Sequence, residues 1–298
     1  MSAMEGKRET RRIGLYGVVG LAIMVVGEVL LLGFKSEFVG QWFTPVMWTG
    51  YILFVDSLVF KLKGESLIRT RTRVFVLMLV FSFGLWEFFE FYNLFIGNWR
   101  YVGMPENPFL KWFGYVWAFA TIWPGILETA ELILALGVFR RARIRRRRDR
   151  ISKGTLYVWT IFGFLCVISP FVTPAGVRPY LAGPVWMGYA FFLDPINYWI
   201  GARSVFADIE RGSMNLFWSL FLSGLICGVL WEFWNYWATA KWIYTVPILG
   251  HIKIFEMPVI GYLGFLPFAM ECYTMFSPIL LLCEKIGLVK SRAMFGES

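Results

Sequence analysis

The chain has 298 residues, of which 58% are hydrophobic, 19% are aromatic and only 16% are charged. Ordinary soluble domains contain roughly 45–50% apolar and about 25% charged residues. The composition therefore excludes a soluble globular enzyme, a disordered chain and a secreted disulfide scaffold, and it indicates a polytopic helical membrane protein. The single histidine, His251, excludes histidine-rich metal sites and two-histidine haem ligation. We expect neither a metal nor a cofactor.

Transmembrane helices are the elements that the sequence predicts most directly. A spanning helix needs about 20 mostly apolar residues. Eight segments come close to this requirement, in chain order 13–34, 43–60, 74–97, 112–138, 156–174, 184–202, 214–238 and 262–283. We therefore expect an all-α polytopic membrane protein with eight transmembrane helices.

Positive charge is distributed unevenly between the loops on the two sides. Of the 29 Lys and Arg residues, 23 lie at the termini or in the segments 61–73, 140–153 and 203–211. The positive-inside rule then predicts a multi-pass protein of the inner or plasma membrane, with both termini in the cytoplasm. The run Arg145–Arg148 suits acidic lipid headgroups, although its simplest interpretation is a topological anchor. Because no folded domain surrounds this run, we do not expect nucleic-acid binding.

The sequence contains an internal duplication. Four motifs recur in the same order, 138 to 143 residues apart: W-x-G-Y-x4-D from Trp48 and Trp186, E-F-[YW]-N from Glu90 and Glu232, W-x-Y from Trp99 and Trp242, and P-x3-E from Pro124 and Pro267. We expect two four-helix repeats, residues 1–139 and 156–298, joined by a basic linker at 140–155. Since four spans return the chain to its starting side, the repeats should be parallel and related by a pseudo-twofold axis along the membrane normal.

Acidic residues inside the predicted spans are the main functional signal. Nine of them occur, with no Lys or Arg in the same spans: Glu28, Asp56, Glu87, Glu90, Glu128, Glu131, Asp194, Glu232 and Glu271. An ionised residue at mid-bilayer costs roughly 2.5–3.5 kcal/mol. Without a cation to pair with, we expect these carboxyl groups to face the bundle interior, either protonated or hydrogen-bonded to Asn, Tyr or Trp. The prolines four residues before Glu128 and Glu271 are expected to kink their helices.

The acids that recur in both halves are the candidate catalytic residues, namely Glu90, Glu128, Glu232, Glu271, Asp56 and Asp194. The candidate substrate-binding residues near them are Asn93, Asn235, Tyr92, Trp234, Trp99 and Trp242. A neutral carboxylic acid in an apolar pocket can donate a proton, and aromatic faces stabilise cations. Together they would isomerise or cyclise an alkene. The alternative interpretation is that the acids hydrogen-bond across helices and hold the bundle together, while the aromatic residues pack or face lipid.

The later spans of each half resemble the membrane lycopene-cyclase-domain family. Trp231-Glu232-Phe233, followed by Pro267 to Glu271 and then Phe276, has the order of that family's tryptophan-aromatic and P-x-E-E motifs. The chain differs from the family in its longer proline-to-glutamate spacing, in Cys272 at the second acidic position, and in having four spans per half instead of three. The resemblance implies cofactor-independent proton chemistry on a prenyl lipid, with Glu128 and Glu271 as candidate acids.

Three functions fit the sequence: a membrane isomerase or cyclase acting on an apolar prenyl or other lipid, a proton-coupled transporter or channel, and a non-catalytic assembly subunit. The spans lack the polar stripe that would line a hydrophilic path, which favours the enzyme. We expect Glu90 and Glu128, or Glu232 and Glu271, to point into one cavity between mid-bilayer and the outer leaflet. The loops 98–111 and 239–261 would cover this cavity, with Trp99 and Trp242 anchoring them at the interface.

Overall fold

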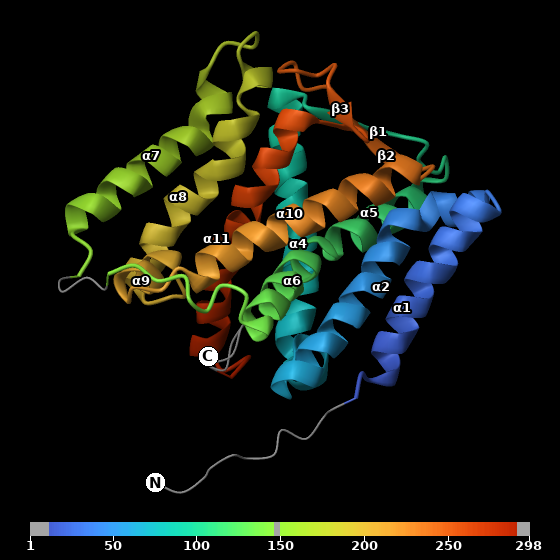
Figure 1. Cartoon of the computed structure of the whole chain (residues 1–298). Coiled ribbons are helices and arrows are strands. Elements are labelled where there is room, and N and C mark those ends of the chain that lie inside the picture. Colours follow the sequence, from blue (N-terminus) through green and yellow to red (C-terminus); the bar gives the residue numbers. More distant parts are fainter. Residues whose placement is uncertain (1–11, 146–149, 291–298) are drawn as a thin grey trace, which may run out of the picture.

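The computed structural model describes residues 12–145 and 150–290, and most of this part of the chain is helical (Figure 1). Seven of its helical segments are long and apolar enough to cross a membrane: Leu15–Gly33, Glu37–Lys63, Thr72–Ile96, Pro108–Leu136, Lys153–Val172, Asn215–Trp237 and Val259–Lys285. The predicted helical, multi-pass membrane architecture is confirmed at this level. Arg146–Arg148 of the basic run lie outside the described residues.

The eighth predicted span, 184–202, corresponds to helix α8 (Ala182–Ile200). Its 19 residues are long enough to cross a bilayer, but α8 is not among the seven segments that are also apolar enough to do so. The reason lies in its second half, where Asp194, Pro195 and Asn197 occur within four residues and are all buried. Helix α8 packs on α7 and on α11.

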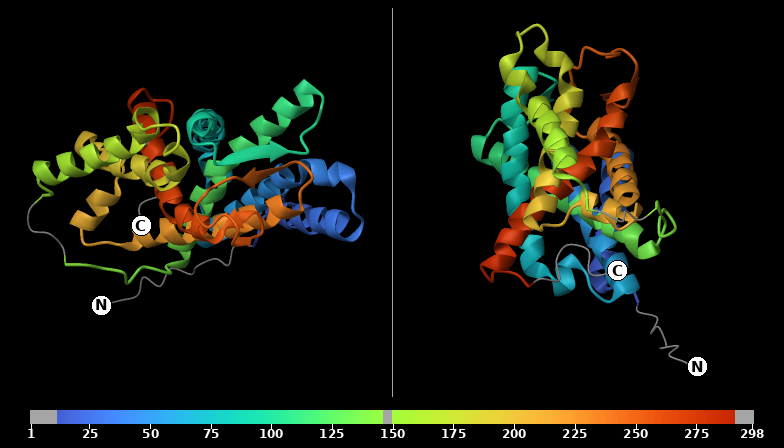
Figure 2. Two further views of the ribbon diagram at one scale, coloured as in Figure 1. Left: turned by 90° about the horizontal axis from the view of Figure 1, so that it is seen from above. Right: turned by 90° about the vertical axis from the view of Figure 1, so that its left-hand side faces the viewer.

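Two helix pairs lie on opposite sides of the bundle, as Figures 1 and 2 show. Helix α1 (Leu15–Glu28) packs on α2 (Glu37–Lys63), and α7 (Lys153–Val172) packs on α8. The central helices are α4 (Thr72–Ile96), α6 (Ile122–Leu136), α10 (Asn215–Trp237) and α11 (Tyr262–Lys285). Packing follows the same order in the two halves, since α2 contacts α6 as α8 contacts α11, and α4 contacts α6 as α10 contacts α11. Helix α10 also contacts α2 and α6, so the two halves share one core.

The predicted span 112–138 consists of two helices. Helix α5 (Pro108–Ala120) ends before Thr121, and α6 begins at Ile122. Pro124 is the third residue of α6, where the missing N–H has no intrahelical acceptor to lose. The distortion expected at Pro124 therefore takes the form of a one-residue interruption at Thr121 between two successive helices, and not of a kink inside one helix. Pro267 does lie inside its helix, α11.

A two-stranded sheet connects the two halves across one end of the bundle. Strand β1 (Trp99–Val102) pairs antiparallel with β2 (Lys241–Tyr244), with Trp99 opposite Tyr244 and Tyr101 opposite Trp242. We call this the sheet end. The remaining short elements at this end are a hairpin of β3 (Lys253–Ile254) and β4 (Met257–Pro258) and the 3-10 turns η2 (Arg178–Tyr180) and η3 (Val259–Gly261). The opposite end, here called the basic end, carries the short helices α3 (Leu67–Thr70) and α9 (Val205–Glu210).

Close helix crossings depend on glycine in the outer pairs. A Cβ atom on Gly20 of α1 would lie 2.5 Å from the backbone oxygen of Gly50 on α2, and one on Gly163 of α7 would lie 2.2 Å from the backbone nitrogen of Phe192 on α8. Both distances are shorter than any van der Waals contact. Backbone atoms cannot relieve such a clash by changing rotamer, so the helices themselves would have to move apart. Small residues of this kind let membrane helices approach closely.

Replacing Gly20 with Leu should separate α1 from α2 and lower the free energy of unfolding by about 1–3 kcal/mol, the usual cost of overpacking. The thermal unfolding midpoint in detergent measures the effect. Gly84→Leu is the matched control, because a side chain on Gly84 of α4 meets no atom within 4 Å. Equal midpoints for the two variants would contradict the close crossing.

Candidate functional site

Glu90 is the centre of an aromatic hydrogen-bond network at the sheet end. Its Oε1 accepts hydrogen bonds from Trp86 Nε1 at 2.9 Å, from Trp99 Nε1 at 3.0 Å and from the Tyr101 hydroxyl at 2.6 Å. Trp86 precedes Glu90 by one turn of α4, whereas the other two donors come from strand β1. Three donors on one oxygen are an environment suited to an ionised carboxylate.

Glu232 of α10 has a sparser set of partners. Its Oε1 accepts a hydrogen bond from the Tyr244 hydroxyl at 2.8 Å, and that hydroxyl in turn accepts one from Trp242 Nε1 at 2.9 Å. The side chain is fully buried, and no described residue donates to its Oε2. Glu232 and Glu90 thus occupy matching positions in the two halves but differ in the number of donors around them.

The tyrosines of these two networks lie in the strands, outside the membrane-spanning segments. Burial raises the pKa of Tyr101 well above its usual value, and the nearby Glu90 carboxylate raises it further. Burial and Glu232 have the same effects on the pKa of Tyr244. Both phenols are therefore protonated at neutral pH and act as hydrogen-bond donors to their glutamates.

The predicted substrate-binding residues Asn93 and Asn235 hold the strands to the helices. Asn93 Nδ2 donates to the Trp99 carbonyl at 2.8 Å and Asn93 Oδ1 accepts from the Trp99 N–H at 3.2 Å. Asn235 makes the same two bonds to Trp242, each at 2.9 Å. Both amides contact backbone and neither lies on the wall of the cavity described next. Their contacts favour a positioning role.

A cavity of about 370 Å³ lies beneath the sheet, between its strands and the ends of α8, α10 and α11. Ligand pockets in proteins are commonly about 300–1,000 Å³. Its wall is mainly apolar and rich in aromatic residues, with five tryptophans contributed by both halves: Trp86, Trp99, Trp186, Trp231 and Trp242. Tyr101 and Tyr244 line the same space. The cavity can therefore accommodate an apolar ligand between π faces while presenting two phenol hydroxyls to it.

The mouth of the cavity is apolar. Tyr180, Ile248 and Leu263 line the cavity and are also exposed at the surface, by 53%, 38% and 65% of their area. They belong to η2, to the loop after β2 and to the start of α11. An opening bordered by such side chains suits a ligand that enters from lipid more than one that enters from water.

The expectation that the glutamates point into one shared cavity is wrong. None of Glu90, Glu128, Glu232 and Glu271 is on the cavity wall. Glu271 accepts a hydrogen bond from the backbone N–H of Tyr189 at 3.0 Å, and no described residue donates to its other oxygen. Within the described structure, the cavity lies under the segments 98–111 and 239–261 as expected. Trp86, Trp99 and Tyr101 separate Glu90 from it, and Tyr244 separates Glu232 from it.

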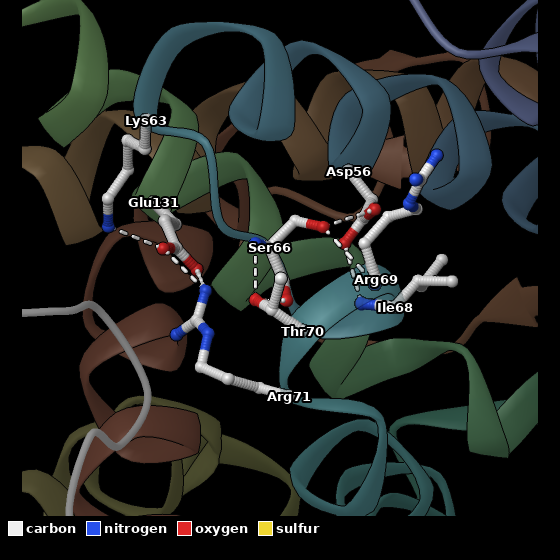
Figure 3. A network of polar contacts seen from close by, with 8 residues as sticks. All are labelled: Asp56, Lys63, Ser66, Ile68, Arg69, Thr70, Arg71 and Glu131. Carbon is white, nitrogen blue, oxygen red and sulfur yellow. Dashed lines mark hydrogen bonds and ion pairs between the residues drawn. The ribbon is translucent and has the colours of Figure 1, made fainter.

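The predicted catalytic residues Asp56 and Asp194 hold short helices at the basic end. Asp56 accepts hydrogen bonds from Ser66 Oγ and from the N–H of Ile68, both at 2.8 Å (Figure 3). Asp194 accepts from Ser204 Oγ at 3.1 Å and from the N–H of Phe206 at 2.8 Å. The serines are the N-caps of α3 and α9. These contacts orient helix starts and favour the structural interpretation of both aspartates.

Glu131 corrects the expectation that the buried acids have no cation to pair with. Its carboxylate is fully buried and accepts from Arg71 Nη2 at 2.7 and 2.8 Å and from Lys63 Nζ at 2.6 Å (Figure 3). Both cations come from the 61–73 segment, which lies between the spans in sequence but folds against α6. Glu128 lies beside Asp56 and Glu131, and no described residue donates to either of its carboxyl oxygens.

Two predicted binding residues lie in the core, away from the cavity wall. The Tyr92 hydroxyl donates to the Val167 carbonyl at 3.0 Å and lies 2.7 Å from the Tyr189 hydroxyl. Trp234 Nε1 donates to Glu28 at 3.2 Å. Of the expected binding residues, Trp99 and Trp242 line the cavity. The sequence motifs also contained residues that were not selected as site residues, namely the tyrosines of W-x-Y, Trp186 of W-x-G-Y and Trp231 beside Glu232.

Comparison with known proteins supplies no family for this chain: no protein-family model, no curated protein and no solved structure matches it.

Replacing Glu131 with Gln should destabilise the protein by about 3–5 kcal/mol, because two cations lose a buried carboxylate. The unfolding midpoint in detergent is the measurement. Glu256→Gln is the matched control: Glu256 pairs with Lys241 at 2.6 Å, but both side chains are partly exposed, so its loss should cost below about 1 kcal/mol. Similar losses in the two variants would show that the Glu131 cluster is not a buried electrostatic anchor.

Proposed function

We propose that this protein is an integral membrane enzyme that isomerises or cyclises an apolar prenyl or other lipid by proton transfer. The observation that carries the proposal is the aromatic cavity with one glutamate–tyrosine pair from each half: Glu90 with Tyr101, and Glu232 with Tyr244. Each tyrosine lines the cavity and each glutamate lies behind its tyrosine. The pairs are thereby suited to exchange protons with a ligand that touches neither carboxyl group.

The different surroundings of the two glutamates assign their roles. Glu232 is buried with one close donor, Tyr244, and only a weak contribution from Trp242, which favours its neutral acid form, and it supplies the proton. Glu90 is surrounded by three donors, which favours the carboxylate, and it receives the proton. Two titratable groups in contrasting environments are the usual basis of such an acid–base division.

The proposed reaction needs no co-reactant. The Tyr244 hydroxyl delivers its proton to an alkene carbon and takes a replacement from Glu232, so that the π electrons form the new C–H bond. The tryptophan faces stabilise the resulting carbocation. A neighbouring C–H bond, or one exposed after ring closure, then loses its proton to the Tyr101 oxygen while Tyr101 passes its own proton to Glu90. The C–H electrons form the new double bond, and exchange with water returns the proton before the next turnover.

The proposed membrane arrangement has eight spans, including α8, in two parallel four-helix repeats, with both termini cytoplasmic and the sheet end facing outward. Support comes from contacts that match between the halves, in particular Asp56 with Ser66 and Asp194 with Ser204, each pair ten residues apart. The lycopene-cyclase-domain resemblance stays a prediction. A hydrophilic transport path is disfavoured by the aromatic wall and apolar mouth of the cavity.

Glu232→Gln and Tyr244→Phe should each lower product formation by roughly 10²–10⁴-fold, because each removes a proton-transfer group while keeping its shape. Membranes from cells that express the protein would be incubated with total lipid extract in D2O buffer and examined by mass spectrometry. Wild type should form a lipid that carries one deuterium from solvent.

The matched control is Glu106→Gln, the same substitution at an exposed site in the loop between β1 and α5. It should retain wild-type activity. If wild-type membranes formed no deuterium-labelled lipid, or if Glu232→Gln formed as much as wild type, proton-transfer catalysis at this site would be refuted.

A further inference from the structure

The outer face of helix α4 carries a regular stripe of residues that no other helix covers. Six residues at alternating intervals of three and four form this stripe, here called the α4 seam: Leu77, Val80, Gly84, Glu87, Phe91 and Leu94. Val80, Phe91 and Leu94 are exposed by 62%, 47% and 80% of their area, and α4 lies at the edge of the bundle in both views of Figure 2. The same spacing occurs on helices that pack side by side at a small crossing angle.

One member of the seam is a carboxylic acid without a partner. Glu87 is partly exposed and lies near the middle of α4, about 22 Å from Thr72 and about 14 Å from Ile96 along the helix axis. It has neither a hydrogen bond nor an ion pair with any described residue. Tyr115 is near it without donating to it, and the nearby charge is that of another acid, Glu90. An ionisable side chain at this depth is costly in lipid and marks a site of interaction.

The seam also has a notch one turn before the acid. A Cβ atom on Gly84 would meet no atom within 4 Å, so no contact within the described chain requires glycine there. Glycine weakens a helix relative to alanine. In membranes, small residues at such positions let a second helix approach closely, as Gly20 and Gly163 do inside this protein. The notch and the acid together suit a helix that comes close at Gly84 and offers a hydrogen-bond donor to Glu87.

We infer that the α4 seam binds a transmembrane helix of another protein, and that this helix carries a lysine or arginine near the middle of its span. The cation pairs with Glu87, and this polar contact fixes the register of an otherwise apolar interface. None of the six seam residues lines the aromatic cavity, so the inference does not depend on the proposed reaction.

A second copy of this chain fits the seam less well. Two copies related by a twofold axis along the membrane normal would place the seam against itself, with one Glu87 facing the other. The described spans carry basic residues only near their ends, such as Lys61, Arg73 and Lys285. A copy in the same orientation therefore has no cation at the depth of Glu87, whereas a different membrane protein can supply one.

Two synthetic transmembrane peptides test the charge requirement. Each is a leucine–alanine helix of about 20 residues with a dansyl group at one end, and the two differ only at the central position, which is lysine in one and leucine in the other. The purified full chain in lipid nanodiscs would be titrated with each peptide, and energy transfer from tryptophan to dansyl reports binding. The lysine peptide should bind at least about tenfold more tightly than the leucine peptide.

Two pairs of variants locate the contact. Glu87→Gln keeps the size of the side chain but removes its charge and should abolish the preference for lysine, whereas Glu106→Gln, at an exposed loop position, should retain it. Gly84→Leu fills the notch and should weaken the lysine peptide about tenfold. Gly33→Leu is the matched control, because it adds the same side chain to an exposed position of another span and also meets no atom within 4 Å. An unchanged unfolding midpoint in Gly84→Leu would show that the loss of binding is not a loss of folding.

Three results would overturn the inference. Equal affinity of wild type for the two peptides, or a preference for lysine that survives in Glu87→Gln, would exclude pairing with Glu87. Equal effects of Gly84→Leu and Gly33→Leu would place the peptide away from the seam. A dimer of the chain in nanodiscs that Gly84→Leu dissociates would assign the seam to a second copy. The lipid-labelling assay of the proposed function is independent of all three.

Discussion

Carboxyl groups buried in an apolar bundle need hydrogen-bond donors from the same chain, and this requirement explains much of the structure. Lipid provides no donors, and tryptophan and tyrosine supply them while remaining largely apolar. Glu90 illustrates the solution, because its donors come from its own helix and from the strand that follows it. The chain must therefore turn back over the end of α4 instead of extending away from the membrane.

The sheet forms because the segments after α4 and α10 both turn back over the bundle and pair with each other. Asn93 and Asn235 bind the backbone of Trp99 and Trp242, which fixes where each strand leaves its helix. The strands then satisfy each other's backbone groups, as exposed edges in or near lipid would otherwise remain unpaired. The same aromatic side chains that satisfy the glutamates line the space enclosed below. The cavity and the two glutamate–tyrosine pairs thus arise from one structural constraint.

The parts of the fold that depend on local composition were predictable, and those that depend on distant pairing were not. Long apolar runs fix helices without reference to the rest of the chain, so the seven apolar spans follow from hydropathy. Strand β1 has only four residues, and its partner lies in the other half, so no local pattern identifies the sheet. The same limit applies to Glu131, since its partner Arg71 lies outside any span and reaches the acid only after the intervening segment folds back. The position of the cavity under the segments 98–111 and 239–261 was predictable, but the intermediate position of the tyrosines was not.

The differences between the halves matter as much as their likeness. Two identical glutamate–tyrosine pairs would have the same proton affinity, so neither would be the preferred donor. The donors around the two carboxyls differ, because Trp86 and Trp99 both donate to Glu90 at 2.9–3.0 Å, whereas Trp242 donates at 2.9 Å to the tyrosine beside Glu232 and only weakly to Glu232 itself. If the halves arose by duplication, the ancestral arrangement supplied two tyrosines facing one cavity. Subsequent divergence of the surrounding tryptophan contacts then made the environments of the two glutamates different.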